Sequence, residues 1–218
     1  MTHSAPPSAL WTTSPADRAR LLGPALGIAL AAIGGCSHGG DAPLGNRNPT
    51  AVAATGVRAI DWRNRAYELA GLGTVTVKDG QADFAINDDG KIVASGATPG
   101  SFRVEPALFA DIDGDGVEDA IVPAVLGTGG TGQFSQVLVF TVRAVQVTEL
   151  GEIPGGDRGD GGIRKVALDG RAILVDRNVL GDGDGACCAS TWRRERWVWK
   201  GGALAEDTTA RGPLQPVP

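Results

Sequence analysis

Residues 134–143 read FSQVLVFTVR, a run in which β-branched and aromatic residues recur throughout. Such side chains pack well on a pleated surface, so this run predicts the strongest strand of the chain. Asp-Gly pairs at 79–80 and 169–170 favour tight hairpin turns, because both residue types tolerate a positive φ. Further strands are expected at residues 74–78, 81–86, 92–95, 101–109, 120–126, 145–153, 163–168, 171–177 and 191–200.

No stretch between these segments is long and periodic enough to form a crossover helix. The 33 glycines and 13 prolines of the 218 residues also favour turns over long helices. We therefore expect a mainly-β fold, either a curved antiparallel sheet or a small β-sandwich. It would form a single domain over residues 58–206, followed by a disordered tail over residues 207–218.

The first 35 residues have the pattern of a signal peptide. Arg18 and Arg20 precede the uncharged run 21–33, LLGPALGIALAAI. This run is shorter than the ~20 apolar residues that a membrane-spanning helix needs. It ends in small residues before Cys36, a pattern that resembles the lipobox of bacterial lipoproteins. The alternative is an ordinary cleaved signal peptide followed by an incidental cysteine.

The lipobox resemblance implies that Cys36 is acylated, becomes the mature N-terminus and anchors the protein to a membrane. Residues 36–57 are rich in small, polar and turn-forming residues and would form a flexible tether. Ser37 follows the cysteine, where an aspartate favours retention in the inner membrane. The expected location is therefore the cell envelope, on the outer membrane facing the periplasm.

Charge and composition exclude several classes of function. The formal net charge of −5 argues against a nucleic-acid partner, which would require a basic face. The two histidines, His3 and His38, lie outside the predicted domain. A catalytic scheme that uses a core imidazole is therefore not expected, and no nucleophile motif is present. We expect a protein that is not an enzyme.

The most specific motif is the acidic segment 111–119, DIDGDGVED. Carboxylates at alternate positions with intervening glycines allow a tight turn to direct several oxygens at one centre. Ca²⁺ accepts six to eight oxygen ligands in irregular geometry, whereas Mg²⁺ demands a near-octahedral shell and fits less well. The expected ligands are the side chains of Asp111, Asp113, Asp115 and Asp119 and the carbonyl of Val117, with Gly116 at the sharp turn. A solvated acidic turn without an ion is the alternative.

This segment is not an EF-hand, because its twelfth position is Val122 instead of glutamate. It resembles the calcium loops of FG-GAP and VCBS repeats, in which the loop joins two strands. Those families carry several copies and this chain has one clean copy, so a full propeller is not expected. The order of the acidic loop, the 129–134 segment and the Cys187-Cys188 pair also resembles a group of small bacterial envelope proteins. That resemblance implies no particular activity.

Three other features have more than one interpretation each. Asp182 and Asp184 have ligand spacing, but the glycine-rich segment 180–185 favours a plain loop over a second ion site. Cys187 and Cys188 are adjacent and could form a vicinal disulfide, remain small buried hydrophobes, or pair through one thiol with another protein. Trp192, Trp197 and Trp199 alternate with arginines, which favours core packing over an exposed patch that grips a glycan or a protein.

The sequence thus favours a membrane-anchored envelope lipoprotein with a calcium-stabilised β-domain that acts as a binding or accessory module. Its partner would be another envelope protein or a glycan. A carboxylate-based hydrolase acting on envelope glycan and a purely structural module are the alternatives.

Overall fold

The computed structural model describes residues 56–96, 98–185 and 187–218. The predicted signal segment 1–35, Cys36 and nearly all of the tether lie outside these residues. The described chain consists of strands, turns and short 3-10 helices, and it contains no α-helix. The predicted mainly-β fold of curved antiparallel sheets in a single domain is therefore confirmed.

The largest sheet has seven strands. Six of them lie in the order β4-β3-β5-β7-β8-β9, and the seventh, β6, pairs with β7 next to the stretch of β7 that pairs with β5. Residues 134–143, predicted to form the strongest strand, lie in β8, one of the central strands of this sheet. All pairings are antiparallel. The strands are β3 (Gln81–Ile86), β4 (Ile92–Val93), β5 (Thr98–Val104), β6 (Leu108–Ala110), β7 (Asp119–Gly127), β8 (Gln133–Arg143) and β9 (Gln146–Asp157).

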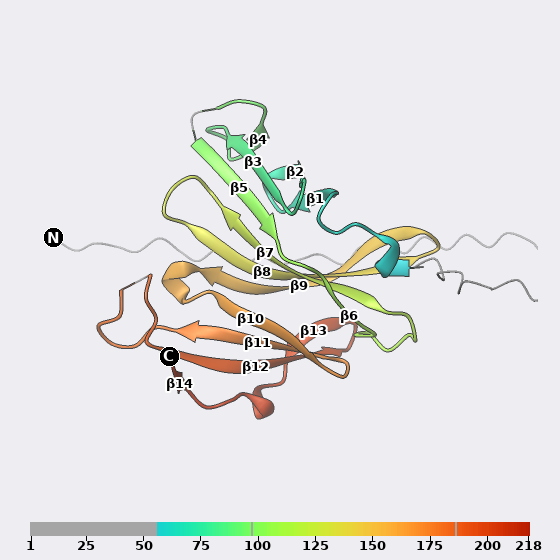
Figure 1. Cartoon of the computed structure of the whole chain (residues 1–218), viewed down its shortest axis with the longest axis vertical. Helices are drawn as coiled ribbons and strands as arrows, with labels where there is room; N and C mark the ends of the chain where they lie inside the picture. Colours follow the sequence, from blue (N-terminus) through green and yellow to red (C-terminus); the bar gives the residue numbers. More distant parts are fainter. Residues whose placement is uncertain (1–55, 97, 186) are drawn as a thin grey trace, which may run out of the picture. The chain divides into compact units, whose positions relative to one another are not determined.

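Two smaller sheets complete the fold. A five-stranded sheet has the order β10-β11-β12-β13, with β14 also paired to β12, and a two-stranded sheet joins β1 to β2. Figure 1 shows β10, β11 and β12 side by side in a layer separate from β5, β7 and β8. The strands are β1 (Ala66–Leu69), β2 (Gly73–Thr76), β10 (Ile163–Asp169), β11 (Ala172–Val179), β12 (Thr191–Lys200), β13 (Ala203–Glu206) and β14 (Gln215–Pro216). The 3-10 helices are η1 (Gly56–Ala59), η2 (Arg158–Asp160) and η3 (Thr208–Ala210).

The large sheet is buried on both faces because its central strands alternate between two cores. Val122 and Leu138 belong to a cluster that the two-stranded sheet and the residues around Trp62 cover. Ile121 and Val137 point to the opposite face and pack against Ile173 and Val175 of β11 in the five-stranded sheet. Successive residues of a strand face opposite sides, so each central strand contributes to both cores.

A buried ion pair within the five-stranded sheet orients an arginine that links this sheet to the large one. The Glu195 carboxylate accepts a 2.8 Å hydrogen bond from Nε of Arg177, and the two side chains are only 4% and 15% exposed. The remaining guanidinium nitrogens of Arg177 donate to the backbone carbonyls of Pro154 and Gly155 in β9, at 2.9 and 2.8 Å. Each nitrogen of this guanidinium therefore has a partner, as burial of an arginine requires.

Two sequence predictions need correction. Residues 207–218, predicted to be a disordered tail, hold η3 and β14, and Gln215 pairs with Trp192 of β12. The backbone N–H of Gly212 also donates to the carbonyl of Arg194, so this segment continues along the edge of β12 that β13 leaves open. The composition of this segment is typical of a frayed end, but the unpaired backbone groups at the edge of β12 hold it in place through hydrogen bonds.

The two Asp-Gly turns behave differently. The predicted hairpin between β10 and β11 forms, with Gly170 and Arg171 as its turn residues, while Asp169 ends β10 and pairs with Ala172. Asp79 and Gly80 both adopt a positive φ and form a turn, but the flanking strands separate after one bridge. β2 pairs with β1 instead, and β3 pairs with β5.

Candidate metal centre

The acidic segment forms the loop between β6 and β7, two strands that pair directly through Ala110 and Asp119. Gly114 and Gly116 have φ values of 80° and 87°, in the left-handed region that favours glycine. The Arg171 guanidinium lies against Gly114 so closely that a Cβ there would come within 1.7 Å of Nη2. The glycines therefore provide both the sharp turn and the close approach of a neighbouring arginine.

Three of the predicted ligands are brought together by this loop. One carboxylate oxygen from each of Asp111, Asp113 and Asp115 lies within 4.8 Å of the other two. Asp111 accepts hydrogen bonds from the N–H groups of Gly114 and Gly116, at 2.6 and 3.2 Å. Asp113 and Asp115 each accept one backbone N–H through Oδ1. The loop backbone therefore holds all three carboxylates toward one side of the turn.

Asp119 occupies a different position from the three other aspartates. Its side chain is fully buried, and Oδ2 accepts the backbone N–H groups of Ile112 and Asp113, at 2.8 and 3.4 Å. Within the part of the chain that the structure describes, neither the buried Oδ1 of Asp119 nor the buried hydroxyl of Thr141 has a hydrogen-bond partner, but that hydroxyl is close enough to lower the pKa of Asp119. Burial has the larger effect and raises the pKa of Asp119 above its usual range. Asp119 closes the base of the loop and keeps one carboxylate oxygen unused.

Arginines surround the loop and partly neutralise it. Nη2 of Arg143, from the end of β8, lies 2.7 Å from Oδ2 of Asp113 and 3.3 Å from Oδ2 of Asp115. Arg171 donates from Nε to the backbone carbonyl of Asp111 at 3.2 Å. Arg58 pairs with Glu118 at 2.5 Å, and this pair lowers the pKa of the Glu118 carboxyl. Of these arginines, Arg143 is the one that occupies carboxylate oxygens of the three-aspartate cluster.

Val117, predicted to contribute its carbonyl, lies at the exposed tip of the loop. Its side chain is 42% exposed, and its N–H donates to Oδ1 of Asp115 at 2.8 Å. The three clustered carboxylates could contribute oxygens to a hard cation such as Ca²⁺, which prefers oxygen ligands at about 2.4 Å. The chemistry of this donor set therefore suits a divalent cation.

The second glycine-rich loop is closed by its own aspartate. Oδ2 of Asp184 accepts hydrogen bonds from the N–H of Gly181 and from both the N–H and the hydroxyl of Ser190, at 2.7, 2.8 and 2.9 Å. These bonds lower the pKa of Asp184. Among the described residues, the three-aspartate cluster is the only group of three or more potential metal ligands.

Cys187 and Cys188 lie exposed in the loop that Asp184 closes, and they are joined as a vicinal disulfide.

The tryptophans of β12 divide between the two faces of its sheet. Trp197 and Trp199 pack against the core between the sheets, as expected for core packing. Trp192 lies on the other face, with the guanidinium carbons of Arg164 and Arg194 at 6.0 and 5.9 Å from its ring centre. A hollow beside Trp192 is also lined by Pro213 and Gln215.

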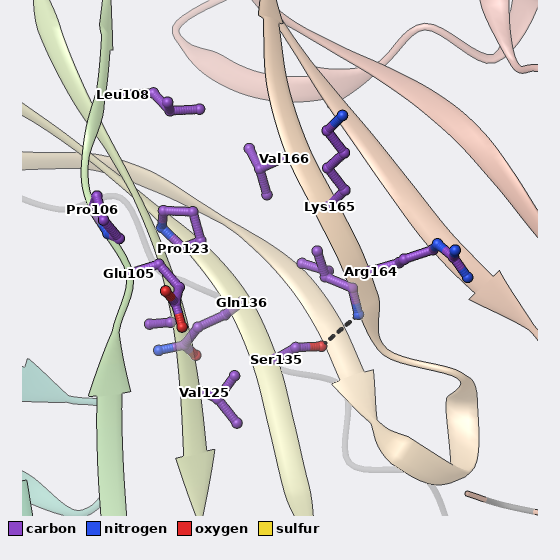
Figure 2. A pocket seen from close by; sticks show the side chains of 12 residues that line it. Glu105, Pro106, Leu108, Pro123, Val125, Ser135, Gln136, Arg164, Lys165 and Val166 are labelled. Atoms are coloured by element: carbon purple, nitrogen blue, oxygen red, sulfur yellow. Dashed lines mark hydrogen bonds between the residues drawn. The ribbon is translucent and has the colours of Figure 1, made fainter. Parts of the chain in front are cut away.

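A cleft of about 360 Å³ between the large sheet and β10 was not predicted from the sequence. Two prolines lie at the break between β5 and β6, Pro106 within the break and Pro123 on the facing strand β7, and neither has an N–H to donate to a neighbouring strand. Figure 2 shows Leu108 and Val166 on opposite walls, with Glu105 at the break and Ser135 hydrogen-bonded to the backbone of β10. A proline inside a predicted strand was the available signal for this break.

No helix among residues 56–96, 98–185 and 187–218 is long and apolar enough to cross a membrane. Comparisons of the chain with known protein families, with curated proteins and with solved structures found no match.

Proposed function

We propose that the loop between β6 and β7 binds a divalent cation, with Ca²⁺ the best match, and that the ion stabilises the β-domain. The observation that supports this proposal is the gathering of carboxylate oxygens from Asp111, Asp113 and Asp115 within 4.8 Å. Like charges this close repel one another, and Arg143 offsets only part of the negative charge of the three carboxylates, so the loop favours a further positive charge. A bound Ca²⁺ would supply that charge and would use the oxygen ligands that it prefers.

Asp119 adds a second argument. A buried carboxylate oxygen without a hydrogen-bond partner is costly, and such groups usually call for an explanation. A small rearrangement of the loop around an ion would bring this oxygen into the ligand set, as the sequence predicts. An ion would also favour the ionised form of Asp119, which burial now disfavours.

A cation that binds the folded loop and not the unfolded chain raises stability according to its concentration. At one hundred times the dissociation constant the gain is about 2.7 kcal/mol. For a domain of this size that corresponds to a rise in Tm of roughly 5–11 °C. The test is thermal unfolding of the chain from residue 37 onward, first in EGTA and then in millimolar calcium.

The variant Asp113→Asn should lose most of this calcium-dependent rise. The matched control is Asp182→Asn, which removes one charge from the other glycine-rich loop and should keep the rise intact. Equal melting temperatures of the parent protein in EGTA and in calcium would overturn the proposal. A magnesium titration run in parallel measures the selectivity, for which the irregular ligand set predicts a preference for calcium.

We propose further that the domain is exported and held at a membrane by acyl chains on Cys36, as a binding or accessory module of the envelope. The lipobox-like run before Cys36 supports this proposal. Two or more acyl chains give durable attachment, because each buried methylene contributes about 0.8 kcal/mol. Expression in a bacterial host should place the protein in the membrane fraction, and Cys36→Ser should release it. A parent protein that is found in the soluble fraction would contradict the anchor.

A further inference from the structure

A second hollow, of about 320 Å³, lies between β1 and the hairpin of β8 and β9, away from the acidic loop. Arg65, at the start of β1, and Glu149, on β9, are among the residues that line it. Phe140 and Val147 provide apolar surface, and Glu68 also faces it, with its carboxylate already accepting the Thr74 hydroxyl. The hollow therefore combines one positive group, negative groups and an apolar wall.

The Arg65 guanidinium has an unused hydrogen-bond donor. It lies over the rings of Trp62, Tyr67 and Phe140, with its central carbon 4.7, 5.3 and 5.4 Å from the ring centres. Nε donates to the carbonyl of Ala66, whereas Nη1 is buried without any acceptor among the described residues. The aromatic rings fix the position of the cation, and a carboxylate is the acceptor that a guanidinium binds best.

A β-bulge places two glutamates on the same face of β9. Phe140 pairs with Glu149 and Leu138 pairs with Glu152, because the register shifts by one residue between them. Residues three apart in a regular strand face opposite sides, but this bulge aligns Glu149 with Glu152. Both residues are exposed, but partial desolvation of their carboxyls raises the pKa of each, and the charge of Glu152 raises the pKa of Glu149 further. No ion pair from the described residues neutralises either one.

We propose that this hollow binds a small zwitterion, with the ligand carboxylate on Arg65 and the ligand ammonium on Glu149, while Glu152 adds negative charge on the same face of β9. The apolar part of the ligand would lie against Phe140 and Val147. A free amino acid or a short peptide has this chemistry, and a dipeptide can place its two charges at opposite ends of the hollow. The site is independent of the metal centre, so either proposal can fail without the other.

The test uses the dipeptide alanyl-leucine and two derivatives, one acetylated at the amine and one amidated at the carboxylate. Binding to the isotope-labelled chain from residue 37 onward is followed by NMR titration of backbone amide shifts. At a typical ligand efficiency, the free dipeptide should bind with a dissociation constant of about 1 mM. Each derivative should bind at least about five-fold more weakly, because it lacks one of the two charges.

Two variants separate the ends of the site. Glu149→Gln should weaken the free dipeptide and the amidated form, which keep the ammonium, and should leave the acetylated form unchanged. Arg65→Lys keeps the charge but removes the planar fork, and should weaken the forms that carry a carboxylate. Glu105→Gln, at an exposed glutamate in the break between β5 and β6, is the matched control and should bind like the parent.

Equal affinity for all three probes, or shifts outside the strands that line the hollow, would overturn the proposal. So would the absence of any shift at about ten times the expected dissociation constant, which would mean that the hollow holds only water. Because Arg65 packs on three rings, Arg65→Lys could unfold. Glu149→Gln, on an exposed edge strand, keeps the proposal testable in that case.

Discussion

Arg143 allows a sharp test of the metal centre, because it occupies the oxygens that a cation would use. Its Nη2 bridges Asp113 and Asp115, at 2.7 and 3.3 Å. An incoming ion must compete with this guanidinium for the same two carboxylates. We therefore predict that the variant Arg143→Gln binds calcium more tightly than the parent protein.

The size of the effect follows from the exposure of the pair. The Arg143 side chain is 57% exposed, and ion pairs of this kind contribute about 0.2–1 kcal/mol each. Two such contacts give about 1 kcal/mol of stabilisation in the metal-free state, which the variant lacks. Its calcium affinity should therefore rise about five-fold. Its metal-free form should melt roughly 2–4 °C lower, and saturating calcium should close this gap.

Isothermal titration calorimetry with calcium measures the affinity of each variant. The titration is run at about 0.15 M salt, because this salt concentration screens long-range effects of the removed charge. Arg58→Gln is the control, because Arg58 pairs with Glu118 on the same loop but not with the clustered aspartates. It removes the same charge and should leave the affinity nearly unchanged. If Arg143→Gln bound calcium no better than Arg58→Gln, the competition between the guanidinium and the ion would be refuted.

Three further predictions concern other parts of the fold. Glu195→Gln leaves Arg177 buried without its counter-charge, which should cost about 3–5 kcal/mol, or roughly 6–20 °C in Tm, in a thermal melt. A loss within the error of the melt would show that this pair does not stabilise the fold. Because the pKa values of Glu149 and Glu152 are raised, the folded state holds more protons than the unfolded state above the ordinary glutamate pKa of about 4.3, so stability falls as the pH rises through this window. Glu149→Gln should therefore have a larger free energy of unfolding than the parent near pH 7 and an equal one near pH 4. Urea unfolding at both pH values tests this, and a variant less stable than the parent near pH 7 would contradict it. The loop that the Cys187-Cys188 bond closes contains no residue between the two cysteines, so Cys187→Ser should change Tm by less than about 2 °C. Thiol titration of the chain without Cys36 should find two thiols only after reduction.

The sequence was most informative about features that depend on local chemistry. The β-branched run of β8, the glycines of the acidic loop and the hairpin at Asp169-Gly170 all follow from preferences of single residues or pairs. The loop geometry also follows from its own spacing, because Asp111 and Asp113 accept hydrogen bonds from N–H groups within the same turn. Such features need no knowledge of which strands pair.

Features that depend on strand pairing could not be predicted. Alternation alone places Glu149 and Glu152 on opposite faces, and only the register shift against β8 aligns them. Arg143 is 28 residues from Asp115 in sequence, and its contact depends on the way β8 returns to the loop. The pairing of the C-terminal segment with β12 likewise depends on an open sheet edge, and that edge exists only once the five-stranded sheet is assembled.

The most direct measurement of the central claim is a crystal structure of the chain from residue 37 onward, grown in calcium, with anomalous diffraction data. The proposal predicts an anomalous peak between Asp111, Asp113 and Asp115, with carboxylate oxygens at about 2.3–2.6 Å and the Arg143 guanidinium displaced from Asp113 and Asp115. A loop without a peak, in which Arg143 still bridges Asp113 and Asp115 at millimolar calcium, would contradict it.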